Sequence, residues 1–145
     1  MLAYAASASE YPRLDKQIDY WGYTWESHNV ATDDDYILTA FRVTGNQDGP
    51  LNPDKPPVVI IHGSFMDAAS WLGSQYWNPE GVKPFHFMLA DAGYDVFLAN
   101  TRGTEYARQH TTYDPAEDEE YWNFSIIEMG LYDVKGYIEL ANEVN

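Results

Sequence analysis

The feature that most constrains the fold is an unbroken apolar run, VVII at residues 58–61, that ends directly on His62-Gly63. Every residue of the run is β-branched, and polar positions do not alternate with apolar ones. We therefore expect a strand that is buried on both faces, as in a parallel sheet covered by helices. Parallel α/β sheets bind ligands at the carboxyl edge, so the run also places His62-Gly63 where a functional loop would lie.

The residues before this strand predict an antiparallel hairpin. Residues 25–30 begin a first strand, the alternation over 37–43 indicates a second, and the aspartate-rich residues 32–35 form the turn between them. The glycine- and proline-rich residues 44–57 then predict an exposed loop.

The residues after the strand predict a βαβ unit and a closing helix. A helix over residues 82–93 ends at a glycine, and an apolar strand over 94–99 follows it. The expected buried stripe of that helix is Phe85, Met88, Leu89 and Ala92. A last amphipathic helix is expected to pack on the sheet through Ile127, Leu131, Val134, Ile138 and Ala141.

Charge and composition exclude several classes of function. The chain has 23 Asp and Glu against 8 Lys and Arg, a net charge of −15, which repels nucleic acid. An acidic surface suits solubility, a low-pH or salty milieu, or a basic partner. With no cysteine, disulfides, thiolate metal sites and a cysteine nucleophile are excluded. No apolar stretch is long enough to predict a transmembrane segment.

The junction at His62-Gly63 has two readings on its own residues. The backbone N–H of Ser64 could donate to an oxyanion, because a fixed amide needs no reorganisation, and glycine leaves room for a substrate. The alternative is a tight turn with a hydrogen-bonded core histidine.

Four stretches together resemble the acid lipase family of α/β-hydrolases, the group of gastric and lysosomal acid lipases. They are YWGYTWESHNVATDDDYIL, VVIIHGSFMDAASW, LADAGYDVFLANTRGTEYARQH and EEYWNFSIIEMGLYDVKGYI. The resemblance implies ester or lipid hydrolysis through an acyl-enzyme, with no cofactor and no metal, and a secreted or lysosome-like location. The fold it implies is the N-terminal portion of an α/β-hydrolase sheet, a β-hairpin followed by βαβ units.

The resemblance also implies roles for individual residues. The amide of Ser64, where the family usually has leucine, would supply half of the oxyanion hole, supported by His62 and Gly63. The segment Asn100, Arg102 and Gly103 matches a structural loop, in which Arg102 would pair with a carboxylate or backbone carbonyls; binding a substrate carboxylate is the alternative. Asp35 stands where the family has glycine, a position for positive φ that aspartate tolerates.

The nucleophile that this chemistry needs is not among residues 1–145. Neither Ser64, in HGSFM, nor Ser74, in LGSQY, lies in a G-x-S-x-G elbow. The sheet is thus incomplete without the elbow strand, and this chain alone is expected to be inactive. Three explanations stay open: a second polypeptide carries the rest of the hydrolase domain, the chain is a non-catalytic structural subunit of a larger assembly, or the sequence is a piece of an ordinary lipase.

The termini and surface give weaker indications. We expect residues 1–18 to be an N-terminal extension or signal-peptide remnant, without a complete signal peptide, and 19–145 to be the lipase part. The sequon at Asn123 would permit glycosylation, although so short a pattern also arises by chance. The histidines lack ligand spacing, and Asp33, Asp34 and Asp35 lack the glycine and distal glutamate of a calcium loop.

Overall fold

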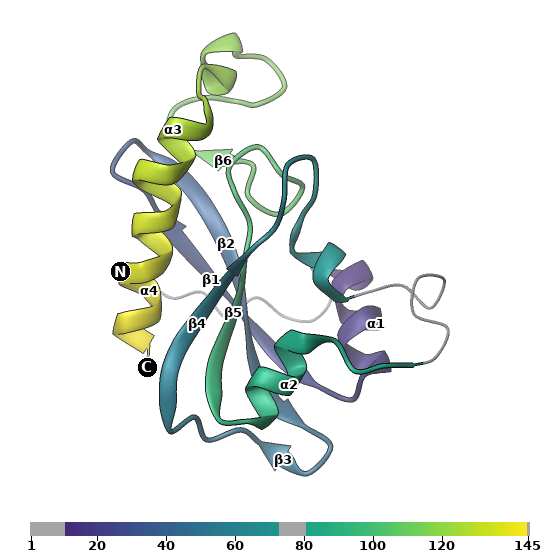
Figure 1. Ribbon diagram of the computed structural model, residues 1–145. Coiled ribbons are helices and arrows are strands. Elements are labelled where there is room, and N and C mark those ends of the chain that lie inside the picture. The colour runs from purple at the N-terminus through teal and green to yellow at the C-terminus, as the bar shows by residue number, and fades with distance from the viewer. Residues whose placement is uncertain (1–10, 73–80, 145) are drawn as a thin grey trace.

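The computed structural model describes residues 11–72 and 81–144, which form a twisted mixed sheet with helices on both faces (Figure 1). The strands are β1 Thr24–Ala31, β2 Tyr36–Asn46, β3 Gly49–Pro50, β4 Lys55–Ile61, β5 Tyr94–Ala99 and β6 Gln109–His110. The α-helices are α1 Pro12–Tyr20, α2 Phe85–Asp91, α3 Ile126–Glu128 and α4 Val134–Val144. Two 3₁₀ helices occupy Ala68–Leu72 and Glu119–Trp122, and a π-helical turn, Met129–Asp133, joins α3 to α4. In the described ranges, no helix is long and apolar enough to cross a membrane.

The sheet has the order β1-β2-β5-β4, and the predicted hairpin and parallel pair are both confirmed. β1 and β2 pair antiparallel around the turn at residues 32–35, and β4 pairs with β5 in parallel. β2 is antiparallel to β5, so the hairpin is joined to the βαβ unit within one sheet. Within the described residues β4 has a strand on one side only, which leaves its other edge open.

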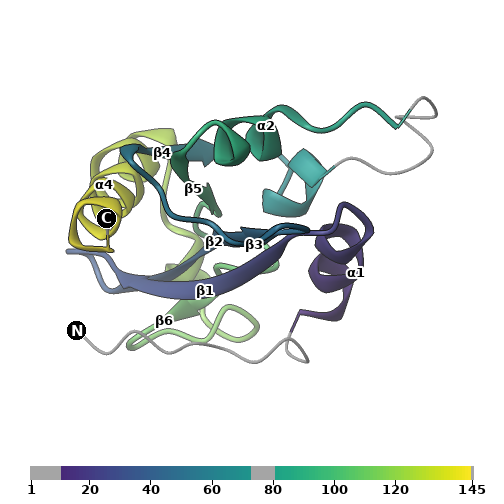
Figure 2. The same ribbon diagram turned by 90° about the horizontal axis from the view of Figure 1, so that it is seen from below.

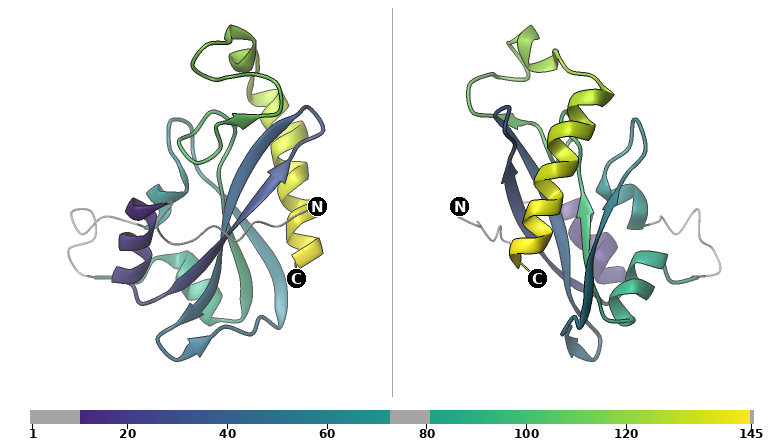
Figure 3. Two further views of the ribbon diagram at one scale, coloured as in Figure 1. Left: turned by 180° about the vertical axis from the view of Figure 1, so that it is seen from behind. Right: turned by 60° about the vertical axis from the view of Figure 1, so that its left-hand side comes forward.

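Each face of the sheet has its own apolar core. On one face, Leu14 and Ile18 of α1 and Phe87 of α2 pack over Phe41 and Val96. On the other face, α4 packs against β2 and β5. The helices therefore cover opposite faces (Figure 3), and α1 and α4 lie at opposite ends of the view from below (Figure 2).

The buried face of α2 differs from the predicted stripe. Phe85 and Met88 are about half exposed, whereas His86, Phe87 and Ala90 are buried. Phe87 stacks on the ring of Tyr23 with 4.0 Å between ring centroids. Because this helix is apolar almost all round, spacing alone could not identify the side that meets the sheet.

The buried face of the last helix also differs from the prediction. Ile127, Leu131 and Ile138 are more than half exposed, and of the predicted stripe only Ala141 is buried. The buried residues of α4 are Gly136, Tyr137, Leu140 and Ala141. A π-helical turn rotates the residues that follow it relative to an α-helix, which a constant spacing of four and three cannot anticipate. Gly136 then faces the sheet so closely that a Cβ would lie 2.8 Å from Val30 Cγ1.

Two further segments differ from expectation. The helix α1 was not predicted, and the proposed boundary after residue 18 falls inside it; residues 1–10 of the expected extension lie outside the described residues. The predicted loop at residues 44–57 is mostly strand, because β2 continues to Asn46 and pairs back with β3. Alternation over 37–43 marked only the central part of that strand.

Candidate active site

The His62-Gly63 junction lies where the parallel strands β4 and β5 end. β4 ends at Ile61 and β5 at Ala99, and these two residues are paired, so the segments that follow them leave the sheet side by side. The backbone N–H of Thr101 donates to Nε2 of His62 at 3.1 Å. The two exit loops are therefore joined through the imidazole ring.

The hydrogen bonds of His62 fix its tautomer. Since the Thr101 amide can only donate, Nε2 of His62 must accept and carries no proton. The proton is then on Nδ1, which lies 2.9 Å from the carbonyl oxygen of Gly63 and donates to it. Both ring nitrogens are used, and His62 is 9% exposed. In this arrangement His62 holds the Gly63 peptide and has no nitrogen left to act as a general base.

A tight turn follows the junction and presents Ser64. The N–H of Met66 donates to the carbonyl of Gly63 at 3.2 Å, which closes a four-residue turn. The left-handed residue of this turn is Phe65, with φ 62°, and not Gly63. Such a conformation costs a bulky residue on the order of 1–3 kcal/mol. Gly63 instead leaves space, since a Cβ there would meet nothing nearer than Met66 Sδ at 3.5 Å.

The amide of Ser64 has no acceptor. Ser64 is exposed, and nothing in the described part of the chain accepts a hydrogen bond from its backbone N–H. An N–H that is held by a turn, open to solvent and free of partners can bind an anionic oxygen without first breaking another bond.

The far end of this segment is held by Asn100. The N–H of Ala68 donates to Oδ1 of Asn100 at 2.9 Å, and Nδ2 of Asn100 donates to the carbonyl of Thr39 at 2.9 Å. Asn100 is fully buried. The segment between His62 and Ala68 is thus attached at both ends to the loop that follows β5.

Arg102 joins that loop to the turn between β1 and β2 and to the π-helical turn before α4. Nη1 and Nη2 donate to the carboxylate of Asp34 at 2.6 and 2.9 Å, and Nε donates to Oδ1 of Asp133 at 2.8 Å. The backbone N–H of Arg102 donates to the second oxygen of Asp133 at 3.0 Å. Asp133 belongs to the π-helical turn, so the turn places a carboxylate that a regular helix would direct elsewhere. The carboxylate partners expected of Arg102 are therefore Asp34 and Asp133.

Electrostatics favour the ionised forms of Arg102 and Asp34, whereas burial raises the pKa of Asp133 despite its hydrogen bonds from Arg102. Burial acts to lower the pKa of Arg102, but its bonds to Asp34 and Asp133 raise that pKa above its usual value. Partial burial acts to raise the pKa of Asp34, but hydrogen bonds from Arg102 and Thr32 hold it below the ordinary range. The guanidinium also lies over the ring of Tyr36 at 3.9 Å. Because Nε, Nη1 and Nη2 of Arg102 already donate to Asp133 and Asp34, the guanidinium has no free pair of N–H donors for a substrate carboxylate.

Gly103 completes the loop. Its φ of 81° is left-handed, and a Cβ would lie 3.0 Å from Trp122 Cζ3. Any other residue would be strained in its backbone and crowded by an aromatic ring.

The remaining candidates from the sequence lie apart from the junction. Asp33 pairs with Lys135 at 2.5 Å while Asp34 binds Arg102, so the aspartates of the turn diverge. Asp35 has φ 73°, as expected for a position where glycine is usual. Among the described residues no group of three or more His, Asp or Glu side chains is placed to hold a metal ion. Asn123 is exposed and accessible, and the serine of its sequon caps α3 through a capping box with Glu128.

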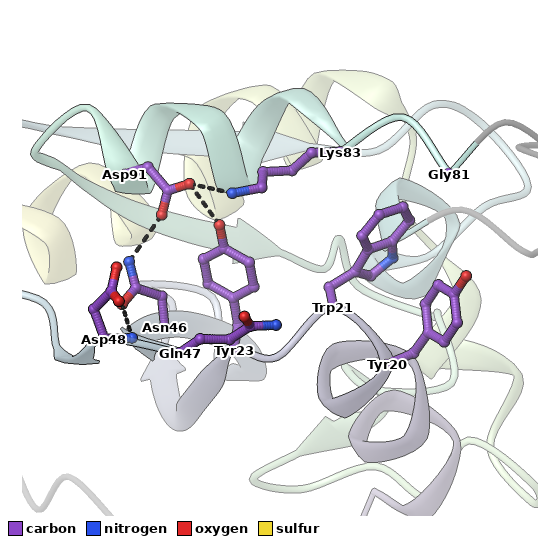
Figure 4. A pocket seen from close by; sticks show the side chains of 9 residues that line it. All are labelled: Tyr20, Trp21, Tyr23, Asn46, Gln47, Asp48, Gly81, Lys83 and Asp91. Atoms are coloured by element: carbon purple, nitrogen blue, oxygen red, sulfur yellow. Dashed lines mark hydrogen bonds and ion pairs between the residues drawn. The ribbon is translucent and has the colours of Figure 1, made fainter.

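A polar cavity of about 710 Å³ lies away from the junction (Figure 4). It is lined by Tyr20, Trp21, Tyr23, Asn46, Gln47, Asp48, Gly81, Lys83 and Asp91. Asp91 accepts from Lys83 at 2.5 Å, from Tyr23 at 2.7 Å and from Asn46 at 3.0 Å. Asp91 precedes β5, so the cavity lies near the amino ends of the parallel strands, and its one lysine, Lys83, is paired with Asp91.

Comparison with known proteins gives one consistent result. A family model described as a partial alpha/beta-hydrolase lipase region matches residues 14–75. Gastric triacylglycerol lipase of Bos taurus is 39% identical over 127 residues, which are 87% of this chain and 30% of the relative. Lipase member K of Homo sapiens is 38% identical over 87% of this chain and 30% of its own length. The tear acid lipase-like protein of Mesocricetus auratus is 36% identical over 88% of this chain and 31% of its own length. The chain thus spans about 30% of the length of these relatives.

Proposed function

Because this chain belongs to the acid lipase family of α/β-hydrolases, as a part from its N-terminal side, we propose that it contributes half of the oxyanion hole of a serine ester hydrolase. The donor is the backbone N–H of Ser64. The observation that carries the proposal is that this amide is free and exposed on a turn whose two ends are fixed, at the carboxyl edge of β4 and β5.

The reaction needs groups from a segment outside residues 1–145. A serine on that segment attacks the ester carbonyl and gives its proton to a histidine oriented by an acid. The carbonyl oxygen becomes an oxyanion, which accepts hydrogen bonds from the Ser64 amide and from the amide after the nucleophile. The intermediate expels the alcohol, which takes the proton from the histidine, and water then hydrolyses the acyl-enzyme to the free acid.

The open edge of β4 is the place where that segment would join. β4 pairs only with β5 in the described sheet, and Val58, Val59 and Ile61 on it are only partly buried. An unpaired strand edge with apolar residues favours addition of another strand. Exposed apolar residues on α3, the π-helical turn and α4, namely Ile126, Ile127, Leu131 and Ile138, offer a surface for the helix that follows the elbow. We propose that the added strand carries G-x-S-x-G, on further sequence of the same protein or on a second polypeptide.

The loop after β5 acts in this proposal as a brace. Asn100 and Thr101 hold the two ends of the oxyanion segment, and Arg102 attaches the loop to the turn after β1 and to the last helix. These residues position the amide and do not contact the ester.

A fluorophosphonate label on the native preparation, read by the intact mass of every chain present, tests the function. Label on a chain that co-purifies, or on a longer polypeptide that contains these residues, would support the proposal and distinguish a split enzyme from a contiguous one. No label anywhere, with the chain at full occupancy, would contradict it and favour the non-catalytic structural subunit.

A further inference from the structure

The residue after the proposed donor combines two unfavourable features. Phe65 has a left-handed backbone, with φ 62°, at the third position of the turn, where glycine or asparagine is usual. Its side chain is fully exposed, with a relative exposure of 110%. Within the described residues no packing offsets the backbone strain or the hydration of the ring. Residues in strained backbone conformations cluster at active sites and ligand-binding positions.

The surroundings of Phe65 indicate what that use is. Met66, the next residue, is 49% exposed and also apolar, so the turn presents an apolar edge directly after the Ser64 amide. On the other side of the amide is Gly63, which carries no side chain; a Cβ there would lie 3.5 Å from Met66 Sδ. A carbonyl oxygen bound at the Ser64 N–H would therefore be followed along the turn by two exposed apolar side chains.

We infer that Phe65 contacts the acyl chain of the ester whose carbonyl oxygen binds the Ser64 amide, and that it favours longer chains. The inference rests on the proposed function and names the substrate class of the same site. Burying one methylene fully is worth about fourfold in binding. Contact with a few methylenes thus gives a preference of about tenfold or more for an octanoyl over an acetyl ester.

The competing explanation is that the segment completing the domain covers Phe65. The two explanations predict opposite effects of Phe65→Gly on stability. A covered ring would be lost from a core, and the melting temperature would fall. A ring that contacts substrate contributes nothing to folding, and glycine would relieve the left-handed backbone, so the melting temperature would hold or rise.

The experiment compares wild type, Phe65→Gly and Asp35→Gly in the complete enzyme, with p-nitrophenyl acetate and p-nitrophenyl octanoate. Asp35→Gly is the matched control, because Asp35 has the same left-handed backbone, with φ 73°, in the turn between β1 and β2. We expect the octanoate-to-acetate ratio of kcat/KM to fall at least tenfold in Phe65→Gly and to stay unchanged in Asp35→Gly.

An unchanged ratio in Phe65→Gly, or a melting temperature lowered by several degrees, would overturn the inference and leave the proposed function standing. If wild type hydrolyses neither ester, the proposed function fails and the inference fails with it.

Discussion

The loops that leave β4 and β5 start side by side but are built in opposite ways. The loop after β5 is held by buried side chains at its start: Asn100 is fully buried, and Arg102 is 2% exposed and bonded to two carboxylates. The loop after β4 is exposed from Gly63 to Met66, contains a strained residue, and leaves the Ser64 amide without an acceptor among the described residues. The contrast is what the proposed function requires, in which one loop is a support and the other binds the oxyanion. Changes in the first should therefore act mainly on stability, and changes in the second mainly on turnover.

The largest effect is expected at the centre of the support. Arg102→Ala leaves Asp34 and Asp133 without their counter-charge, and Asp133 is fully buried. Breaking a buried pair on one side costs about 3–5 kcal/mol. Urea unfolding of the complete enzyme should show that loss of unfolding free energy.

Arg13→Ala provides the matched control, since Arg13 is 60% exposed and makes its ion pairs at 3.6 and 3.8 Å. It should cost less than about 1 kcal/mol. A loss as small as that in Arg102→Ala would show that the loop after β5 is not the support described here.

His86 in α2 differs from Arg102, because in the described part of the chain it is buried without the partners that Arg102 has. His86 in α2 is fully buried, and neither ring nitrogen has a hydrogen-bond partner among the described residues. Burial lowers the pKa of His86 from 6.5 to about 4. Between pH 6.5 and 4 the unfolded chain binds a proton at His86 that the folded protein does not bind. The free energy of unfolding is therefore unaffected by His86 above pH 6.5, falls as the pH drops to 4, and does not fall further below pH 4. The loss is about 3 kcal/mol.

His86→Leu removes the titrating group and keeps an apolar side chain of similar size. Urea unfolding at several pH values should show a flatter dependence for this variant between pH 6.5 and 4. Parallel curves for wild type and variant would rule out His86 as the cause.

The link between the two loops should affect turnover more than stability. His62→Phe removes the acceptor for the Thr101 amide and the donor to Gly63. A loosened Ser64 amide should lower kcat by about 10–100-fold, because small misplacements are costly in catalysis, with less change in KM.

An amide side chain can accept and donate as the neutral imidazole does, so His62→Asn should recover part of the lost kcat. Equal losses in both variants, or a loss confined to KM, would contradict a positioning role.

The sequence predicted the parts of the fold that depend on local pattern. The β-branched run before His62 identified the buried parallel strand, and the aspartate-rich turn identified the hairpin. Helix faces were not predictable, because α2 is apolar nearly all round and the π-helical turn shifts the register before α4. Nothing local distinguishes these cases from a regular amphipathic helix.

The hydrogen bonds that hold the loop after β4 in place could not be predicted from the sequence either. The bonds from Thr101 to His62 and from Ala68 to Asn100 join backbone amides to side chains more than thirty residues away, and backbone amides carry no residue signature. Within the aspartate triplet, only the fold determines that Asp34 meets Arg102. The motif HG marked the turn to which we assign the proposed site, but the sequence around Phe65 does not indicate its left-handed backbone.

The most direct test is a comparison of Ser64→Pro with Ser64→Ala in the complete enzyme. Proline suits the second position of a tight turn, so it removes the N–H and keeps the turn, while alanine keeps the N–H. The account predicts that kcat falls by about 10²–10³ in Ser64→Pro and remains near wild type in Ser64→Ala, with similar circular dichroism spectra and melting temperatures. Near-normal turnover in a folded Ser64→Pro variant would contradict the assignment of this amide to the oxyanion hole.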